Sequence, residues 1–244
     1  AGYHQLIKDS KQSGKPAVLV DPMMGSGTFC IEAALIACDI APGLLRQRAL
    51  GQIMNKNYVP PAVRWKHEPD NARQLWKSLV KDATERERVG REWFSGSNSS
   101  TGDNIPNCRI LGNEFNSGAM HLAKEYSQQA RLDFGVDNND SSAAIQFREG
   151  NCENWDVQSQ LIPGRSIIVT NPPWGLRLSD DIEESWSCLK RFLRKENCGG
   201  VEAWVLSGNK DLTRVLRMKK TRSVPLDTAD ESLRWIQYHI FEKY

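Results

Sequence analysis

The feature that most constrains this chain is an apolar run that passes directly into a glycine-rich turn. Residues 18–34 read VLVDPMMGSGTFCIEAA, and a continuous apolar run before such a turn predicts a strand buried on both faces, as in a parallel sheet. Gly25 and Gly27 take positive φ at little steric cost. The run from 28 to 38 predicts a helix, with Thr28 as its cap. Strand, glycine turn and helix form the first unit of a doubly wound α/β sheet, and ligands bind at that turn.

The residues of this turn narrow the class of ligand. Cys30 stands where the dinucleotide fingerprint has its third glycine, and no Gly-Lys-Ser/Thr follows to cradle a phosphate. The remaining interpretation is the loop of a class I methyltransferase, which holds the methionine part of S-adenosylmethionine. The alternative is a tight strand-to-helix turn in another kind of α/β protein. The expected cofactor contacts in this loop are Asp21, Pro22, Met23, Gly25, Ser26, Gly27 and Thr28.

A second apolar run ends in an unusual tetrad. Residues 167–170 read IIVT and predict another buried strand, and Asn171-Pro172-Pro173-Trp174 follows at once. The tetrad therefore lies at the carboxyl end of a strand, where α/β proteins have their active sites.

Four segments together carry a family resemblance. Residues 21–28 (DPMMGSGT), 31–34 (IEAA), 39–44 (DIAPGL) and 171–178 (NPPWGLRL) resemble the THUMP-associated RNA guanine methyltransferases, and most of all the bacterial enzymes that methylate a guanine 2-amino group in large-subunit ribosomal RNA. The resemblance covers nearly the whole chain, and 39–44 is its most family-specific part. It implies a Rossmann-like class I α/β fold with seven mostly parallel strands, the last antiparallel. It also implies S-adenosylmethionine as cofactor and ribosomal or transfer RNA as partner.

The composition sets broad limits. A chain of 244 residues is long enough for one domain with a full core, and we expect a single catalytic domain over 1–244. The net charge of +2 does not by itself require a nucleic-acid partner. No apolar run approaches the ~20 residues of a membrane helix, and residues 1–16 lack the apolar centre of a signal peptide.

The cysteines and histidines are scattered. None of the six cysteines forms a Cys-x-x-Cys pair, which favours a reduced intracellular protein, in the cytoplasm or an organelle. We expect no metal site, and the sequence leaves the oligomeric state open.

The rest of the chain alternates between helical and strand patterns. Predicted helices cover 67–92, 116–134, 180–196 and 209–216. Predicted strands cover 108–112, 144–149 and 203–206, followed by a closing hairpin of 219–224 and 233–241. Residues 45–65 are predicted to be irregular, and the Ser-, Gly- and Asn-rich residues 95–107 a flexible insertion.

The amino-terminal residues 1–16 are short and polar. The family places a helix and an RNA-binding THUMP domain before the first strand, and this sequence shows neither. We therefore expect the chain to be a C-terminal piece, or a truncated form, of a longer protein.

Two further positions match the family's cofactor pocket. Glu114 follows the strand at 108–112 and matches the acid that accepts hydrogen bonds from both ribose hydroxyls. The alternative is a surface glutamate that starts a helix. Asn151, after the strand at 144–149, stands where relatives commonly have an aspartate that accepts from the adenine amino group. Its amide oxygen still accepts, but without the charge. Cys152 completes this part of the pocket.

The resemblance assigns the chemistry to the tetrad. The side-chain oxygen of Asn171 and the carbonyl of Pro172 would accept the two hydrogens of the target amine, which aims the nitrogen lone pair at the methyl group for in-line transfer. Pro172 and Pro173 stiffen the segment. A splayed base would stack on Trp174, a contact worth ~1–3 kcal/mol.

Seven basic residues are candidates for contact with RNA phosphates. The alternative is an ordinary solvated face. They are Arg177, Lys210, Arg214, Arg217, Lys219, Lys220 and Arg222.

Two rival functions stay open. One is methylation of an adenine, a transfer RNA guanine or a protein glutamine, since enzymes of all these kinds use an Asn-Pro-Pro-aromatic tetrad. The other is a non-catalytic RNA-binding or partner subunit. Binding of S-adenosylmethionine separates the second from the enzymes.

The departure at Asn151 yields a prediction. Asn151→Asp should tighten S-adenosylmethionine binding by about 1 kcal/mol, because a charged acceptor replaces a neutral one. Calorimetric titration of the parent and variant chains measures the difference. Weaker binding by the aspartate variant would mean that Asn151 donates, or lies outside the pocket.

Overall fold

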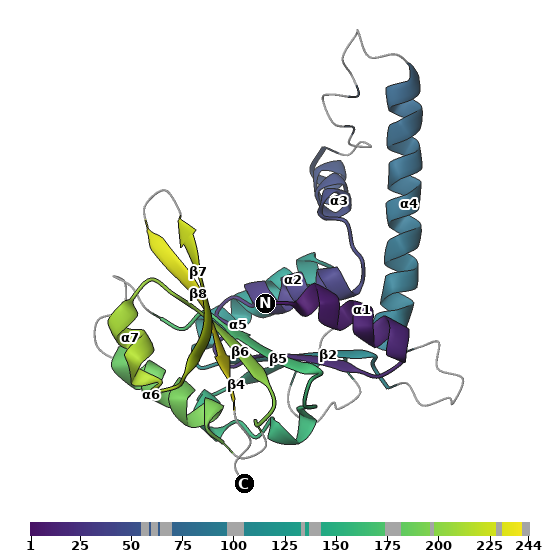
Figure 1. The fold of residues 1–244 in the computed structure, drawn as a ribbon. Coiled ribbons are helices and arrows are strands. Elements are labelled where there is room, and N and C mark those ends of the chain that lie inside the picture. Colours follow the sequence, from purple (N-terminus) through teal and green to yellow (C-terminus); the bar gives the residue numbers. More distant parts are fainter. Residues whose placement is uncertain are drawn as a thin grey trace.

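A central twisted sheet organises the chain (Figure 1). The computed structural model describes residues 1–54, 59, 63, 70–96, 105–132, 135–136, 143–173, 182–195, 198–227 and 231–240. The sheet has eight strands in the order β3-β4-β2-β1-β5-β6-β8-β7. They are β1 (Ala17–Asp21), β2 (Cys108–Glu114), β3 (Gly135–Val136), β4 (Ile145–Glu149), β5 (Ser166–Thr170), β6 (Glu202–Ser207), β7 (Lys220–Asp227) and β8 (Ser232–His239).

Seven α-helices and two short 3-10 helices are described around the sheet. The α-helices are α1 (Tyr3–Ser13), α2 (Thr28–Ala37), α3 (Pro42–Met54), α4 (Asp70–Ser95), α5 (Ser117–Gln129), α6 (Ile182–Leu193) and α7 (Lys210–Val215). The 3-10 helices are η2 (Cys152–Asn154) and η3 (Gln158–Gln160).

The predicted strand pattern is confirmed. β4, β2, β1, β5 and β6 are parallel. β8 runs antiparallel to β6 and pairs with β7 as the predicted closing hairpin. The two-residue β3 adds an outer, parallel edge beside β4. All parallel strands therefore end at one edge of the sheet.

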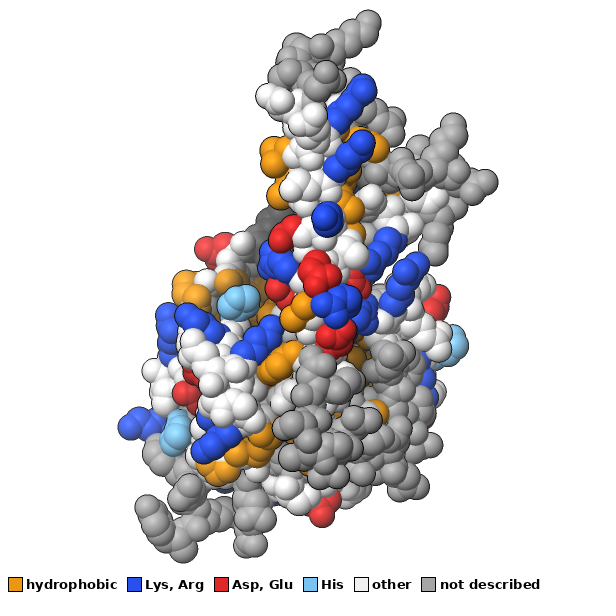
Figure 2. Space-filling model, turned by 90° about the vertical axis from the view of Figure 1, so that its right-hand side faces the viewer, with side chains coloured by type: hydrophobic (Ala, Val, Ile, Leu, Met, Phe, Trp, Pro, Cys, Tyr) orange, Lys and Arg blue, Asp and Glu red, His pale blue; other side chains and the backbone are white. Residues whose placement is uncertain are grey.

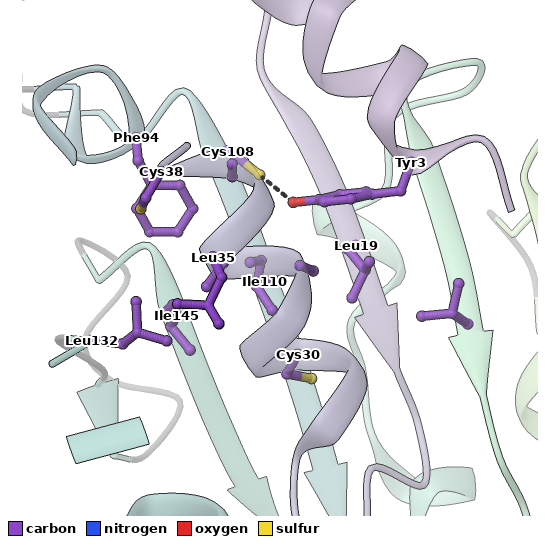
Figure 3. Close-up of a cluster of buried hydrophobic side chains, with 14 of the residues drawn as sticks. Tyr3, Leu19, Cys30, Leu35, Cys38, Phe94, Cys108, Ile110, Leu132 and Ile145 are labelled. Carbon is purple, nitrogen blue, oxygen red and sulfur yellow. Dashed lines mark hydrogen bonds between the residues drawn. The ribbon is translucent and has the colours of Figure 1, made fainter. Parts of the chain in front are cut away.

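Both faces of the sheet are buried, which explains the unbroken apolar runs. Along β1, Ala17 and Leu19 enter one core cluster while Val18 and Val20 enter the other. The first cluster packs under α1, α2 and α5, and Figure 3 shows its side chains, with the Tyr3 hydroxyl 3.3 Å from the Cys108 Sγ. The second cluster packs under α6 and α7. All six cysteines are free and buried.

Two expectations about irregular segments are wrong. Residues 1–16 contain α1, whose Tyr3 and Ile7 are buried one helical turn apart. The surrounding polar residues conceal this narrow apolar stripe. Residues 45–54 continue α3, which starts at Pro42, a residue suited to the first helical position. Positions 55–58 and most of 60–69 lie outside the described residues.

Other boundaries shift by a few residues. The helix predicted at 116–134 ends earlier, because Arg131 takes a left-handed φ of 55° and breaks the helical backbone. Of the predicted insertion at 95–107, residues 97–104 lie outside the described residues. Its two ends meet, since a Cβ on Gly96 would lie 2.0 Å from the Ile105 carbonyl oxygen.

In the described part of the chain, no single helix is long and apolar enough to cross a membrane. The α2 helix and the first part of α3 pass that test only as a pair bent by 105°.

The long α4 helix projects from the body, with α3 beside it (Figure 1). Its base is fixed by close packing, since a Cβ on Gly90 would lie 2.0 Å from the Cys38 carbonyl oxygen. Ion pairs add to this: Arg86 binds Asp39 at 2.6 Å, and Arg48 binds the buried Glu87 at 2.7 Å. Burial raises the pKa of Glu87, but the bonds from Arg48 and then Arg91 outweigh it and leave that pKa lowered.

The contact at Gly90 generates a stability prediction. Gly90→Ala should lower the free energy of unfolding by about 1–3 kcal/mol, because the added methyl overlaps rigid backbone at the α4 base. Gly43→Ala is the control: no atom lies within 4 Å of its added Cβ, so unfolding should change by less than about 1 kcal/mol. Urea titration measures both, and equal stability of the two variants would contradict this packing.

Candidate active site

The loop after β1 begins with a buried carboxyl group. Asp21 is 1% exposed, and its Oδ1 accepts a hydrogen bond from the Met23 N–H at 3.1 Å. Gly25 and Gly27 have φ of 56° and 80°, as the glycine turn predicted. Thr28 does not cap α2: Gly27 is the N-cap, and no side chain bonds there. The Thr28 hydroxyl lies 3.5 Å from that of Ser26 instead.

Gly27 also permits close packing of two helices. A Cβ there would lie 3.1 Å from the Ala123 Cβ on α5, so the start of α2 and α5 approach through this position. No atom lies within 4 Å of a Cβ built on Gly25. The space beside Gly25 is therefore open to a ligand.

The structure brings the predicted acid to this turn. Glu114, half-buried at the end of β2, accepts from the Gly25 N–H at 2.8 Å through Oε2. Its Oε1 accepts from the Asn116 N–H at 2.8 Å. This side chain thus bonds both a loop 89 residues away and the residue that caps the start of α5.

Asn113, which the sequence reasoning missed, joins three loops at this edge. It is 1% exposed. Its Nδ2 donates to the Pro22 carbonyl at 3.1 Å and the Gly150 carbonyl at 2.9 Å, and its Oδ1 accepts from Arg148 at 2.6 Å. An amide inside an otherwise apolar strand, directly before the predicted acid, was the available signal, because a buried amide needs partners.

The third loop follows β4. The Gly150 N–H donates to the Glu114 carbonyl at 2.8 Å. The Asn151 Oδ1 already accepts from the Glu153 N–H at 3.0 Å, where it caps η2, and its Nδ2 lies 3.5 Å from the Cys188 Sγ. Cys152 is buried. The amide oxygen expected to meet adenine is thus occupied by the backbone in this structure.

A group with metal-ligand chemistry lies beside this loop. Ligand atoms of Glu153, Glu184 and Cys188 lie within 4.8 Å of one another. The guanidinium of Arg191 bonds both carboxylates and lies 3.2 Å from the Cys188 Sγ. The arginine supplies the positive charge there and fastens η2 to α6.

Asn171, Pro172 and Pro173 directly follow the end of β5, as predicted. Asn171 is exposed and Pro172 is buried. The Pro173 carbonyl accepts from the indole Nε1 of Trp186 at 2.7 Å, and Trp186 is fully buried on α6. This bond, which the sequence did not indicate, anchors the segment. Trp174 and Arg177 lie outside the described residues.

The environment of Asp21 perturbs its titration. Burial raises the pKa of Asp21 to about 7, and the hydrogen bond from the Met23 N–H partly opposes that rise. The nearby Glu114 charge raises it further. Asp21 therefore titrates close to neutral pH, at the point where β1 and the glycine turn meet.

Of the predicted basic residues that the structure describes, two contact neighbouring side chains. Arg214 pairs with Asp211 at 2.7 Å, and Lys220 donates to Thr213 at 3.0 Å. Burial and then the Arg234 charge lower the pKa of Lys220. Arg222 lies near the amino terminus, where burial and then the Arg222 charge lower the pKa of the Ala1 amine.

The remaining members of this set are exposed. Lys210 lies on α7, and the other two lie on the turn that follows it. These two are Arg217 and Lys219, of which Arg217 is left-handed with φ 48°.

The fold and these loops define a class of protein. The central order β4-β2-β1-β5-β6-β8-β7, with β8 antiparallel, is that of a class I S-adenosylmethionine-dependent methyltransferase. The strand order reverses between β1 and β5, and the loops after these two strands lie at the point where doubly wound sheets bind ligands. More narrowly, the chain belongs to the UPF0020 family, described as RMKL-like, methyltransferase domain, whose model matches residues 10–237.

Curated relatives carry one name. The ribosomal RNA large subunit methyltransferase K/L of Syntrophotalea carbinolica is 30% identical over 229 residues, covering 92% of this chain and 27% of that protein. The protein of the same name from Pseudoalteromonas atlantica is 27% identical, covering 98% of this chain and 28% of that protein. The chain thus spans about a quarter of the length of these relatives.

Solved structures share the fold. A possible methylase from Clostridium difficile superposes with a TM-score of 0.65 at 22% identity, covering 93% of this chain and 49% of that one. A predicted N6-adenine-specific DNA methylase from Listeria monocytogenes gives 0.57 at 23% identity, covering 92% and 46%. A putative methyltransferase solved with S-adenosylhomocysteine gives 0.59 at 18% identity, covering 94% and 49%.

The raised pKa of Asp21 predicts a pH dependence of stability. The folded-state pKa of about 7 lies above the ordinary 3.8, so between these values the folded state holds a proton that the unfolded state has lost. The free energy of unfolding should fall as pH rises from about 4 to 7, by at most about 4 kcal/mol. In the Asp21→Asn variant the free energy of unfolding should not fall over this pH range.

Urea titrations across this pH range measure the effect. Asp156→Asn, a change at an exposed aspartate, is the control and should keep the parent's slope. An Asp21→Asn variant with the parent's pH dependence would contradict the burial of an ionisable group here.

Proposed function

We propose that the chain is the catalytic domain of an S-adenosylmethionine-dependent RNA methyltransferase that acts on the 2-amino group of a guanine, in large-subunit ribosomal RNA. The observation that carries this proposal is the joining of three loop ends at one sheet edge by Asn113 and Glu114, beside the Asn171-Pro172-Pro173 segment. The names of the relatives support the RNA substrate and an intracellular setting.

The described residues fit the cofactor. The glycine turn offers open space at Gly25 for the methionine part. Glu114 would accept from the ribose hydroxyls after its bond to the Gly25 N–H is broken. Asn151 and Cys152 would border the adenine. When bound, S-adenosylmethionine supplies a methyl group on a sulfonium, and these residues orient it. The solved relative with S-adenosylhomocysteine supports this choice.

Phe115 extends this proposal. It directly follows Glu114 and is 77% exposed at the ligand-binding edge. A purine is a suitable partner for an exposed aromatic face. We assign Phe115 as a further wall of the adenine pocket. Its place directly after the acid was the sequence signal.

The tetrad would act on the target amine. The exocyclic nitrogen of guanine is a poor nucleophile, because its lone pair is delocalised into the ring. Acceptance of its two hydrogens by the Asn171 side chain and the Pro172 carbonyl would direct that lone pair at the methyl group. The bond from Trp186 to Pro173 holds the backbone next to that carbonyl. Trp174 is proposed to stack on the base.

This proposal yields a catalytic prediction. Asn171→Ala should lower the turnover number by at least about a hundredfold while S-adenosylmethionine binding stays at the parent level, because the lost acceptor acts mainly on the reacting amine. Gln12→Ala, at an exposed amide side chain on α1, is the matched control. The assay is transfer of labelled methyl to ribosomal RNA by the longer protein that carries this domain.

The same assay tests the tetrad and its rivals. Trp174→Ala should raise the KM for RNA, and Trp174→Phe should retain part of the affinity, because a ring face survives. Full activity of the Asn171→Ala variant would contradict the assignment of the tetrad as the active site. Recovery of the labelled methyl group in adenine, transfer RNA or protein would show that the substrate is that molecule and not a guanine of ribosomal RNA. A parent chain that binds no cofactor would favour the non-catalytic subunit.

A further inference from the structure

The two halves of α4 differ in charge. Residues 82–95 contain four acids and three arginines, and each arginine is paired: Arg86 with Asp39, Arg88 with Glu85, and Arg91 with Glu87. The outer half begins with Asp70, and the residues that follow it, 71–81, read NARQLWKSLVK and contain three basic residues and no acid. The base of the helix is thus charge-compensated, and its outer half is positive.

The three basic residues of the outer half share one face. Arg73, Lys77 and Lys81 are spaced four residues apart and are exposed, so they form a stripe with about 6 Å between neighbours along the helix. In the described part of the chain no ion pair to any of them is found. Figure 2, which looks onto α4, shows Lys and Arg side chains along the projecting helix and acids only toward its base.

The stripe is presented on a supported helix. The opposite flank exposes Leu75 and Leu79, at 61% and 53%, while Trp76 and Val80 between the flanks are half-buried. The helix is fixed at its base by the close contact of Gly90 with Cys38. From Gly90, the stripe begins about 14 Å and ends about 26 Å out along the helix axis.

We propose that Arg73, Lys77 and Lys81 form a phosphate-binding arm that contacts the RNA backbone outside the active site. Three cations in line suit a chain of phosphates, because contact releases condensed counterions. A solvated helix needs no such separation of charge between its halves. This inference rests on the proposed RNA substrate and adds the place where that substrate is held. The exposed leucines face the other way and are not needed for it.

The test uses the 244-residue chain and a transcribed fragment of large-subunit ribosomal RNA. The variant is Arg73→Gln, Lys77→Gln, Lys81→Gln. Its control, Lys8→Gln, Lys15→Gln, Lys190→Gln, removes the same charge from three lysines elsewhere. The arm variant should bind RNA at least about tenfold more weakly, and the slope of log K against log salt should fall by about 2–3. The control should show a smaller loss and nearly the parent's slope.

A second measurement separates RNA binding from the methyl-transfer step. In the methyl-transfer assay the arm variant should raise the KM for RNA with the turnover number within about twofold of the parent. Cofactor binding should not change, and thermal unfolding should show that the variant is folded. A loss of RNA binding in the arm variant supports the arm even if no methyl transfer is detected. Failure of the arm and failure of the proposed methyltransferase activity therefore give different results.

Several results would overturn the arm. One is an arm variant with the parent's RNA affinity and salt slope, and another is a control that loses as much. No measurable RNA binding by the parent chain is a third. Co-sedimentation with phosphatidylglycerol vesicles tests whether the stripe binds an anionic membrane surface instead of RNA. Vesicle binding lost in the arm variant, with RNA binding unchanged, would assign the stripe to lipid headgroups.

Discussion

The site depends on the hydrogen bonds of one buried amide. Asn113 donates to the carbonyls of Pro22 and Gly150 and accepts from Arg148. These bonds hold the loops after β1 and β4 against the end of β2. Removal of a buried, fully bonded amide leaves several polar groups unsatisfied, each at a cost of about 1–3 kcal/mol. The shape of the cofactor pocket therefore depends on a residue whose side chain lies inside the sheet.

The sheet makes this arrangement possible. Five parallel strands buried on both faces end at a single edge, so loops distant in the sequence meet there. Backbone bonds reinforce the meeting: the Met24 N–H donates to the Asn113 carbonyl at 3.0 Å, and the Gly150 N–H to the Glu114 carbonyl at 2.8 Å. The Pro173 carbonyl is held separately, through Trp186. The cofactor and substrate parts of the proposed site thus have different anchors.

Much of this was accessible from the sequence, for physical reasons. Buried parallel strands leave unbroken apolar runs, and a tight turn requires glycine, so β1, β5 and the Gly25–Gly27 turn could be predicted. The partners of Asn113 and Trp186 could not, because both donate to backbone carbonyls far along the chain, and residue types do not encode those. The helix α1 escaped detection because its buried stripe is only one residue wide in each turn.

The central claim is that three loop ends, 21–28, 113–116 and 150–152, together form one S-adenosylmethionine pocket. Amide hydrogen exchange of the chain, with and without S-adenosylhomocysteine, tests it most directly. The account expects slower exchange on ligand addition in all three segments, with α3 and α4 unchanged. Protection in only one segment, or elsewhere in the chain, would contradict it.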